Sequence, residues 1–364
     1  MIPVYRPSIG EREKRYVAEA MESGWISSRG AFLDRFEKDF AAYIGCRQGV
    51  AAANGTVALH LAFAALGIGP GDEVIVPTFT YVASVNAIAY TGATPVFVDS
   101  EPQYWNMDPA LVEAAITPRT RAIEVVHLYG HPADLDPILD IAARHNLAVV
   151  EDAAECHGAT YKGRKVGSIG TIGSFSFFGN KIITTGEGGM LVTGDDELAE
   201  RARRLRGQGV SPTRTYCHEI VGFNYRMTNI AAAIGCAQLE RVEETLAAKR
   251  AIAGWYRAGL EGIEGVIVQT EAPWATSVYW MNSILVDPGL RDPLRTELAV
   301  QGIETRPFFY PAHTLPMYSS EVRFPVAERL GASGINLPSF AELQEEQVAA
   351  VCAAVRRFVE TRPA

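Results

Sequence analysis

The sequence lacks the cysteine and histidine spacings that hold metals or cross-link small folds. Its five cysteines are scattered over 364 residues, without a C-x-x-C pair or a Cys/His ligand pattern. We therefore expect neither a disulfide framework nor a zinc site, and no bound metal. A chain of this length buries most of its apolar surface without such support.

Excess basic charge and long apolar runs are missing too. The formal net charge is −9 at pH 7, which argues against nonspecific nucleic-acid binding because that requires a basic surface. No apolar run approaches the roughly 20 residues of a transmembrane helix, and residues 1–16 are too charged for a signal peptide. We expect a cytoplasmic protein without nucleic-acid or membrane partners.

Glycine fingerprints of nucleotide-binding enzymes are also absent. No G-x-G-x-x-G follows a strand candidate, and no G-x-x-x-x-G-K-[ST] occurs. This absence counts against a nicotinamide-dependent oxidoreductase, which is one alternative for a chain with a layered sheet. A noncatalytic protein that keeps such a fold to bind a ligand or partner is another.

Short apolar strands alternate with helical stretches in the first two-thirds of the chain. The strand candidates are residues 49–53, 73–77, 94–98, 122–126 and 148–151. The helix candidates between them are 56–66, 82–90, 111–116 and 135–145. This pattern predicts an α/β fold with a large, mostly parallel sheet covered on both faces. Ligands of such sheets collect at the carboxyl ends of the strands.

The pattern changes after Lys181. Helices are predicted over 197–206 and 227–260, and the second is long enough to link two domains. A smaller α+β unit follows, with strands at 266–269 and 280–286 and helices at 292–301 and 344–360. We predict a large domain over residues 1–245 and a small C-terminal domain over 246–364.

Lys181 stands between an aromatic segment and a glycine-rich turn. Phe175, Phe177 and Phe178 precede it, and glycines follow at positions 186, 188 and 189. A lysine that holds pyridoxal 5'-phosphate (PLP) as a Schiff base needs a partly desolvated amine and backbone room for a planar cofactor. A lone lysine before a turn is usually a solvated surface residue, but the aromatic neighbours favour the cofactor.

Asp152 follows the apolar strand at 148–151. PLP chemistry needs a carboxylate against the pyridine nitrogen, so that the ring stays protonated and withdraws electrons from the substrate carbon. A helix cap or a turn acid gives the same pattern, and for Asp152 alone the two alternatives are equal. Together with Lys181, Asp152 favours a cofactor site.

Gly55 and Thr56 lie between the first sheet strand and a helix. Gly55 lets the backbone approach an anion, and Thr56 can cap the helix while free N–H groups face a phosphate. An ordinary strand–turn–helix cap is the alternative. Tyr81, which follows the next strand, either stacks on a cofactor ring or packs in the core.

With these residues assembled, the chain resembles the DegT/DnrJ/EryC1/StrS family of sugar aminotransferases, which have the fold-type I aminotransferase architecture. The similarity covers nearly the whole chain and rests on six separated blocks. They are residues 80–100, 126–132, 175–190, 222–235, 305–318 and 334–340.

The resemblance implies a role for each cofactor residue. Lys181 would hold PLP and act as acid and base, Asp152 would pair with the pyridine nitrogen, and Tyr81 would stack on the ring. Glu155 stands where most members have a glutamine that contacts the ring oxygen. His157, two residues further on, is either a pocket acid/base or a packed, hydrogen-bonded histidine, and the packed histidine is the favoured alternative.

The resemblance also implies a shared site. Gly55, Thr56 and Ser176 would hold the cofactor phosphate, together with Asn224 of the partner subunit. We therefore expect a homodimer or a dimer of dimers. Arg226 would reach the donor carboxylate or the substrate phosphates, with a structural salt bridge as the alternative.

The same resemblance indicates the substrates. Relatives that remove a hydroxyl carry histidine at the position of Lys181, so lysine favours amination. The implied reaction moves an amino group from L-glutamate to the C4 ketone of GDP-4-dehydro-6-deoxy-D-mannose, for surface polysaccharide synthesis. A UDP- or dTDP-linked 4-keto-6-deoxy sugar is the alternative acceptor. Tyr310, His313 and Tyr318, in a proline-punctuated loop, are candidates for sugar or nucleotide contacts, with packing an equal alternative.

Overall fold

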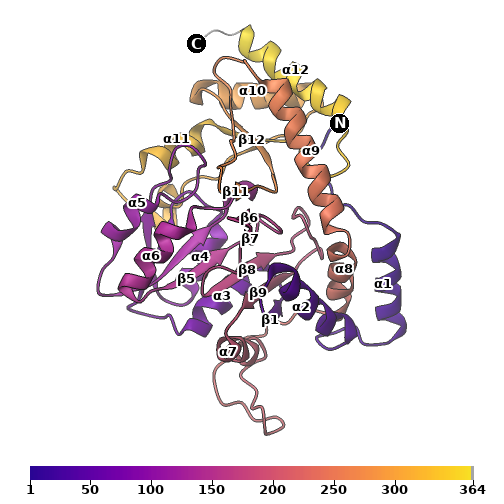
Figure 1. Ribbon diagram of the computed structural model, residues 1–364, viewed down its shortest axis with the longest axis vertical. Coiled ribbons are helices and arrows are strands. Elements are labelled where there is room, and N and C mark those ends of the chain that lie inside the picture. Colours follow the sequence, from indigo (N-terminus) through magenta and orange to yellow (C-terminus); the bar gives the residue numbers. More distant parts are fainter. Residues whose placement is uncertain (362–364) are drawn as a thin grey trace.

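A seven-stranded sheet forms the centre of the computed structural model, which describes residues 1–361 (Figure 1). The strand order is β1-β9-β8-β5-β4-β2-β3, and only β9 runs against its neighbours. The strands are Gln48–Ala52 (β1), Glu73–Pro77 (β2), Thr94–Val98 (β3), Thr120–Val126 (β4), Ala148–Asp152 (β5), Ile172–Ser176 (β8) and Gly189–Thr193 (β9). The predicted α/β fold with a mostly parallel sheet is confirmed, although β8 and β9 were not predicted.

Helices cover both faces of this sheet. Alternate residues of each strand point to opposite faces and pack against different helices. Val150 packs in the layer that contains α3 (Gly55–Leu66), α4 (Val82–Tyr90) and α7 (Asp196–Arg206). Val149 packs in the opposite layer, whose helices include α2 (Ala31–Ile44) and α6 (Leu135–His145). Two short segments, α5 (Pro109–Val112) and the 3₁₀ turn η1 (Glu113–Ala115), replace the helix predicted over 111–116.

Local sequence explains where α3 begins and ends. The side chain of Asn54 accepts a hydrogen bond from Val57 N at 3.0 Å and caps the helix. Gly67 ends it with a φ of 79°, a left-handed conformation that glycine adopts without steric cost. The helix therefore points its N-terminus at the carboxyl end of β1, where the sequence predicts an anion site.

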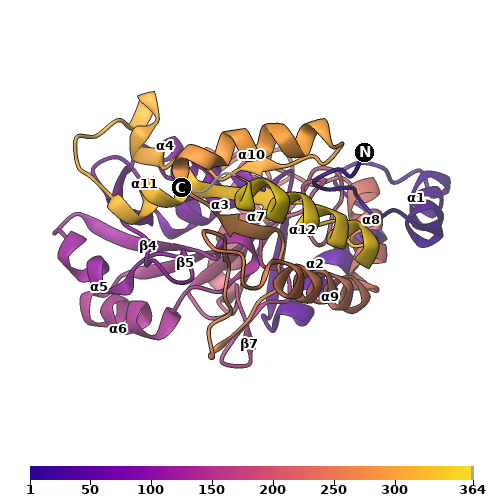
Figure 2. The same cartoon turned by 90° about the horizontal axis from the view of Figure 1, so that it is seen from above.

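The C-terminal part builds a second, antiparallel sheet in the order β10-β12-β14-β13. Its strands are Ile267–Val268 (β10), Asn282–Leu285 (β12), Arg306–Pro307 (β13) and Gly334–Leu337 (β14). Its helices are Pro288–Val300 (α10), Pro325–Ser333 (α11) and Glu345–Glu360 (α12). Helices α9 (Val242–Leu260) and α12 lie side by side over this unit (Figure 2).

Helix α9 belongs to both parts of the chain. Val242 and Leu246 pack in the core beneath the large sheet, whereas Ile252 and Tyr256 pack in the core of the smaller unit. The division at residue 245 therefore falls inside one continuous helix and stays a prediction. A three-stranded sheet of β6 (Thr160–Tyr161), β7 (Arg164–Lys165) and β11 (Ala275–Thr276) also joins the two parts.

The prediction of one helix over 227–260 is wrong. Helix α8 (Asn229–Leu239) ends before α9 begins, and Arg241 between them has a non-helical backbone (φ −121°, ψ 16°). The Arg241 side chain donates to Glu13 Oε1 at 2.9 Å and to Ser8 Oγ at 3.0 Å. At this break the chain thus contacts the N-terminal segment, where α1 (Glu11–Glu22) packs on α8.

Three further 3₁₀ turns complete the described elements, namely Leu128–Gly130 (η2), Ala312–Thr314 (η3) and Pro316–Tyr318 (η4). Within residues 1–361, no helix has both the length and the apolar character that a membrane crossing requires. In the same range no group of three or more His, Cys, Asp and Glu side chains is arranged to hold a metal ion.

A buried lysine ties α9 to the smaller unit. Lys249 Nζ donates to the carbonyl oxygen of Trp280 at 2.7 Å and to that of Ser339. A neutral amine has two N–H groups, which match these two acceptors. Burial lowers the pKa of Lys249 from 10.5 to about 7, because a charged amine loses its hydration here.

This lysine makes the stability of the fold depend on pH. Between pH 7 and pH 10.5 the unfolded chain holds a proton at Lys249 that the folded chain has lost. Folded protein therefore gains stability as the pH rises through this range. Relative to Lys249→Met, the wild type should gain unfolding free energy from pH 7 to about pH 10 in chemical denaturation. The exposed control Lys38→Met should show no such trend, and a pH-independent gap for Lys249→Met would contradict the prediction.

Candidate active site

Lys181 lies in the turn that follows β8, at the carboxyl edge of the sheet. Its side chain is only 11% exposed, and Nζ lies 3.6 Å from Glu155 Oε1. Phe175 and Phe177 of the preceding segment are fully buried, whereas Phe178 is 43% exposed. The structure therefore gives Lys181 a partly desolvated position, as its aromatic neighbours predicted.

Asp152 ends β5 on the α4 side of the sheet. Its Oδ2 accepts from Ser84 Oγ at 2.8 Å, and its Oδ1 accepts from Ala154 N at 3.1 Å. Burial raises the pKa of Asp152, and these hydrogen bonds and the positive charge of Lys181 act in the opposite direction. These two hydrogen bonds hold the carboxylate in a fixed orientation. The positive charge of Lys181 stabilises its ionised form.

Glu155 joins Lys181 to the turn after β4. Its Oε2 accepts from Tyr129 N at 2.7 Å, and its Oε1 faces the lysine amine. Burial raises the pKa of Glu155 to about 7, against the influence of Lys181 and of the Tyr129 N–H. This carboxyl group therefore changes its charge near neutral pH.

Gly55, Thr56 and Ser176 form a cradle at the N-terminus of α3. A Cβ atom on Gly55 would lie 2.5 Å from Ser176 Cβ and 2.9 Å from Ser176 Oγ, so only glycine allows this approach. The N–H groups in the first turn of a helix have no intrahelical partner, and the helix dipole favours an anion there. Residues about 120 positions apart in sequence therefore come together at a helix N-terminus, and their contact with a phosphate stays a prediction.

The remaining predicted cofactor contacts lie nearer the surface. Tyr81 is 56% exposed at the start of α4, and its ring centroid lies 5.4 Å from that of Phe309. Asn224 is exposed and pairs with Gly207 at the base of segment 208–222, which projects below α7 in Figure 1. Arg226 is half-buried two residues later. The contact of Asn224 with a partner subunit's site stays a prediction.

The three substrate candidates have different surroundings. Tyr310 is 60% exposed. His313 is buried, with Nδ1 2.7 Å from Thr78 Oγ1, and Tyr318 donates from its hydroxyl to Asn86 Oδ1 at 2.6 Å. His313 and Tyr318 thus anchor their loop to β2 and α4, which favours the packing alternative for both. Their ligand contacts stay predictions.

His157 is a packed residue. Its ring centroid lies 5.4 Å from that of Phe175 and 5.6 Å from that of Phe177, and its side chain is fully buried. Burial lowers the pKa of His157 to about 3. The ring is therefore neutral at pH 7, which favours the packing alternative.

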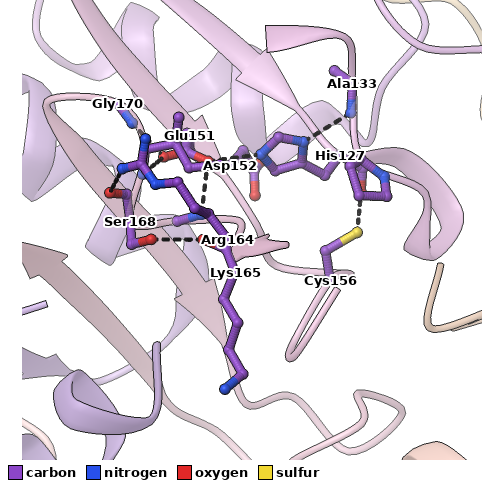
Figure 3. Close-up of polar contacts among 12 residues, drawn as sticks. His127, Ala133, Glu151, Asp152, Cys156, Arg164, Lys165, Ser168 and Gly170 are labelled. Atoms are coloured by element: carbon purple, nitrogen blue, oxygen red, sulfur yellow. Dashed lines mark hydrogen bonds and ion pairs between the residues drawn. The ribbon is translucent and has the colours of Figure 1, made fainter. Parts of the chain in front are cut away.

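Sequence reasoning missed a support behind Asp152, which Figure 3 shows. Glu151 points to the opposite face of β5, where its Oε2 lies 3.1 Å from His127 Nε2. Its two oxygens also accept from the backbone N–H groups of Gly167, Ile169 and Gly170. Burial alone would raise the pKa of Glu151, but these donors lower it overall.

His127 links Glu151 to Asp152 through a main-chain hydrogen bond. His127 Nδ1 accepts from Ala133 N at 3.1 Å, so Nε2 carries the proton that faces Glu151. The backbone N–H of His127 donates to the carbonyl of Asp152 at 3.0 Å. The sequence signals for this support are Glu151, which directly precedes Asp152, and His127 in the block 126–132.

The sequence pattern of the DegT/DnrJ/EryC1/StrS aminotransferase family matches residues 7–356. The chain belongs to this family. The aminotransferase is 52% identical over 360 residues to GDP-perosamine synthase of Caulobacter vibrioides, and the alignment covers 97% of each chain. It is also 52% identical over 359 residues to GDP-perosamine synthase of Escherichia coli O157:H7, and this alignment covers 98% of each chain.

Solved structures agree with the fold. DesV of S. venezuelae is 41% identical, with a TM-score of 0.91 over 95% of this chain and 94% of that one. The putative sugar aminotransferase Spr1654 of Streptococcus pneumoniae, in its PLP form, is 29% identical, with a TM-score of 0.94 over 99% of each chain. The expected fold-type I architecture is thereby confirmed, and the family is PLP-dependent.

The residues of this aminotransferase fit such a cofactor. The helix N-terminus at Gly55 suits a phosphate, and the oriented carboxylate of Asp152 suits a protonated pyridine nitrogen. Lys181 offers an amine beside Asp152 and Glu155. The assignment of each contact stays a prediction.

Gly55→Ala tests the cradle. The added methyl group would overlap Ser176, so the affinity of the apo-protein for PLP should fall about tenfold or more in an absorbance titration. Affinity for pyridoxal, which has no phosphate, should change little. Gly254→Ala in α9 is the matched control, because its Cβ meets nothing within 4 Å. Equal PLP affinities of the two variants would contradict the predicted phosphate site.

Proposed function

We propose that this chain transfers an amino group from L-glutamate to the C4 ketone of GDP-4-dehydro-6-deoxy-D-mannose, giving GDP-perosamine and 2-oxoglutarate. The observation that carries the proposal is the 52% identity to two GDP-perosamine synthases over nearly the full length of each chain. A third GDP-perosamine synthase, from Vibrio cholerae, is 46% identical over 364 residues. The product would serve O-antigen and lipopolysaccharide synthesis.

The side chains around Lys181 account for the proton movements. Bound PLP would supply an electron-withdrawing ring that carries the amino group between the two substrates. Within each half-reaction Lys181 Nζ would act as base and then as acid. It would remove the proton from the Cα of glutamate in the first half-reaction and deliver a proton to C4 of the sugar in the second. Glu155 at 3.6 Å would stabilise the charged amine between these steps.

Asp152 would keep the cofactor ring protonated. Ser84 and Ala154 hold its two oxygens, so that the carboxylate is oriented before any ligand arrives. Both half-reactions would use one pocket, which agrees with the PLP and PMP forms solved for the S. pneumoniae relative. The homodimer or dimer of dimers, with Asn224 of the partner subunit at the phosphate, and the cytoplasmic location remain parts of this proposal.

Two relatives support a UDP- or dTDP-linked acceptor, although their names place the amino group at C3 and not at C4. The chain is 41% identical over 350 residues to dTDP-3-amino-3,4,6-trideoxy-alpha-D-glucose transaminase of Streptomyces venezuelae. It is 42% identical over 325 residues to a UDP-N-acetyl-3-dehydro-alpha-D-glucosamine aminotransferase of Acidithiobacillus ferrooxidans. These identities are lower than those to the GDP-sugar enzymes, so the GDP-linked acceptor is preferred.

A panel of nucleotide sugars tests the acceptor. With glutamate as donor, kcat/KM for GDP-4-dehydro-6-deoxy-D-mannose should exceed that for dTDP- and UDP-linked 4-keto-6-deoxy sugars by about tenfold or more. Formation of 2-oxoglutarate and mass spectrometry of the amino sugar measure both products. Faster turnover of a dTDP- or UDP-linked sugar would assign the chain to the second class.

Lys181→Ala tests the catalytic assignment. Loss of the amine should lower kcat by at least about 10³-fold, because both the attachment point and the acid/base group disappear. The circular dichroism spectrum and the thermal midpoint should stay close to those of the wild type. Lys14→Ala, which removes an exposed amine paired with Glu11, should keep full activity. Unchanged turnover in Lys181→Ala would favour a noncatalytic protein.

A further inference from the structure

Trp280 is a second neighbour of the lysine amine that the sequence did not indicate. The centroid of its indole ring lies 3.9 Å from Lys181 Nζ. Its Nε1–H donates to the carbonyl oxygen of Asn180, the residue before the lysine, at 2.8 Å. One side chain from the C-terminal part of the chain therefore contacts both the amine and the backbone of the lysine turn.

The amine consequently has two attractive neighbours. Glu155 Oε1 lies 3.6 Å away and carries negative charge when ionised, and the indole face carries a negative quadrupole. Both attract a positively charged amine, and the lysine side chain is only 11% exposed. A cation–π contact is stronger where water is largely excluded, as it is here.

Trp280 is itself held from several sides. Its side chain is 5% exposed, and its carbonyl oxygen accepts from the buried Lys249 Nζ at 2.7 Å. Its ring stacks on Tyr129 with an interplanar angle of 12° and a centroid distance of 6.2 Å. Tyr129 in turn donates from its backbone N–H to Glu155. The indole and the carboxylate beside the amine thus belong to one connected group.

Packing alone does not account for this arrangement. A purely apolar wall would be formed equally well by phenylalanine, but Trp280 directs its N–H to the peptide that precedes the lysine. We infer that Trp280 is a positioning residue for Lys181: its ring holds the amine in place by a cation–π contact, and its N–H fixes the lysine turn. This role deepens the proposed function and rests on Lys181 as the acid/base group.

The test measures the reactivity of Lys181 in the apo-protein, without cofactor or substrate. The amine lines a cavity with Arg6 and Trp280, so a limiting amount of acetic anhydride at pH 7 can acetylate it. Mass spectrometry of the peptide that contains Lys181 gives the rate. Trp280→Leu should raise this rate about three- to tenfold, because the amine loses the ring that covers one of its sides and holds it in place.

Two variants separate the contributions. Trp280→Phe keeps an aromatic face and loses the N–H, so its rate should lie between those of the wild type and Trp280→Leu. Trp274→Leu is the matched control, because Trp274 packs against Tyr104 and His131, and its rate should equal that of the wild type. Thermal midpoints report whether each variant folds. Should Trp280→Leu not fold, Trp280→Phe decides, and a wild-type rate in that variant would overturn the inference.

Kinetics of the loaded enzyme provide a second readout. Trp280→Leu should lower kcat with little change in the KM for glutamate, and Trp280→Phe should recover part of the loss. An effect on KM alone, or equal effects of Trp280→Leu and Trp274→Leu, would overturn the positioning role. Wild-type protein that aminates no keto sugar would sink the proposed function, whereas the acetylation rates of the apo-protein would still report on Trp280.

Discussion

The site depends on the burial of three carboxyl groups between residues 151 and 155. Each one leaves water at the carboxyl end of β5, so each requires hydrogen-bond donors from its surroundings. Glu151 takes them from loop 167–170 and His127, Asp152 takes them from Ser84 and Ala154, and Glu155 takes one from Tyr129. Satisfying these groups ties β4, α4 and the loop before β8 to the end of β5.

The lysine is the positive counterpart of this acidic strand end. Lys181 faces Glu155 directly and stabilises the charge of Asp152, while the N-terminus of α3 at Gly55 favours an anion on the same edge. The smaller C-terminal unit completes the arrangement from the other direction. Lys249 and Trp280 connect α9, the start of β12 and the lysine turn. A movement of the C-terminal unit relative to the large sheet would therefore change the surroundings of the lysine amine.

Much of this could be predicted from the sequence, because the signals are local. Apolar strands that alternate with helices gave the parallel sheet, and polar residues after strand ends gave Asp152, Tyr81 and the turn at Gly55. The break at Arg241 could not be predicted, since residues 240–241 contain neither glycine nor proline and the helical pattern continues through them. Its cause is a contact with Glu13 and Ser8, more than 220 positions away in the chain.

By itself, the sequence determined the fold class, the family resemblance and the lysine and aspartate on which the proposed chemistry rests. Those features follow from residue type, period and spacing, which act over a few turns of chain. Only the tertiary structure decided which way each carboxylate points and what surrounds the amine. Neighbouring residues of a strand face opposite layers, so Glu151 and Asp152 acquire different partners. Trp280 reaches Lys181 across about 100 residues because the polypeptide returns to the sheet edge only after the smaller unit has begun.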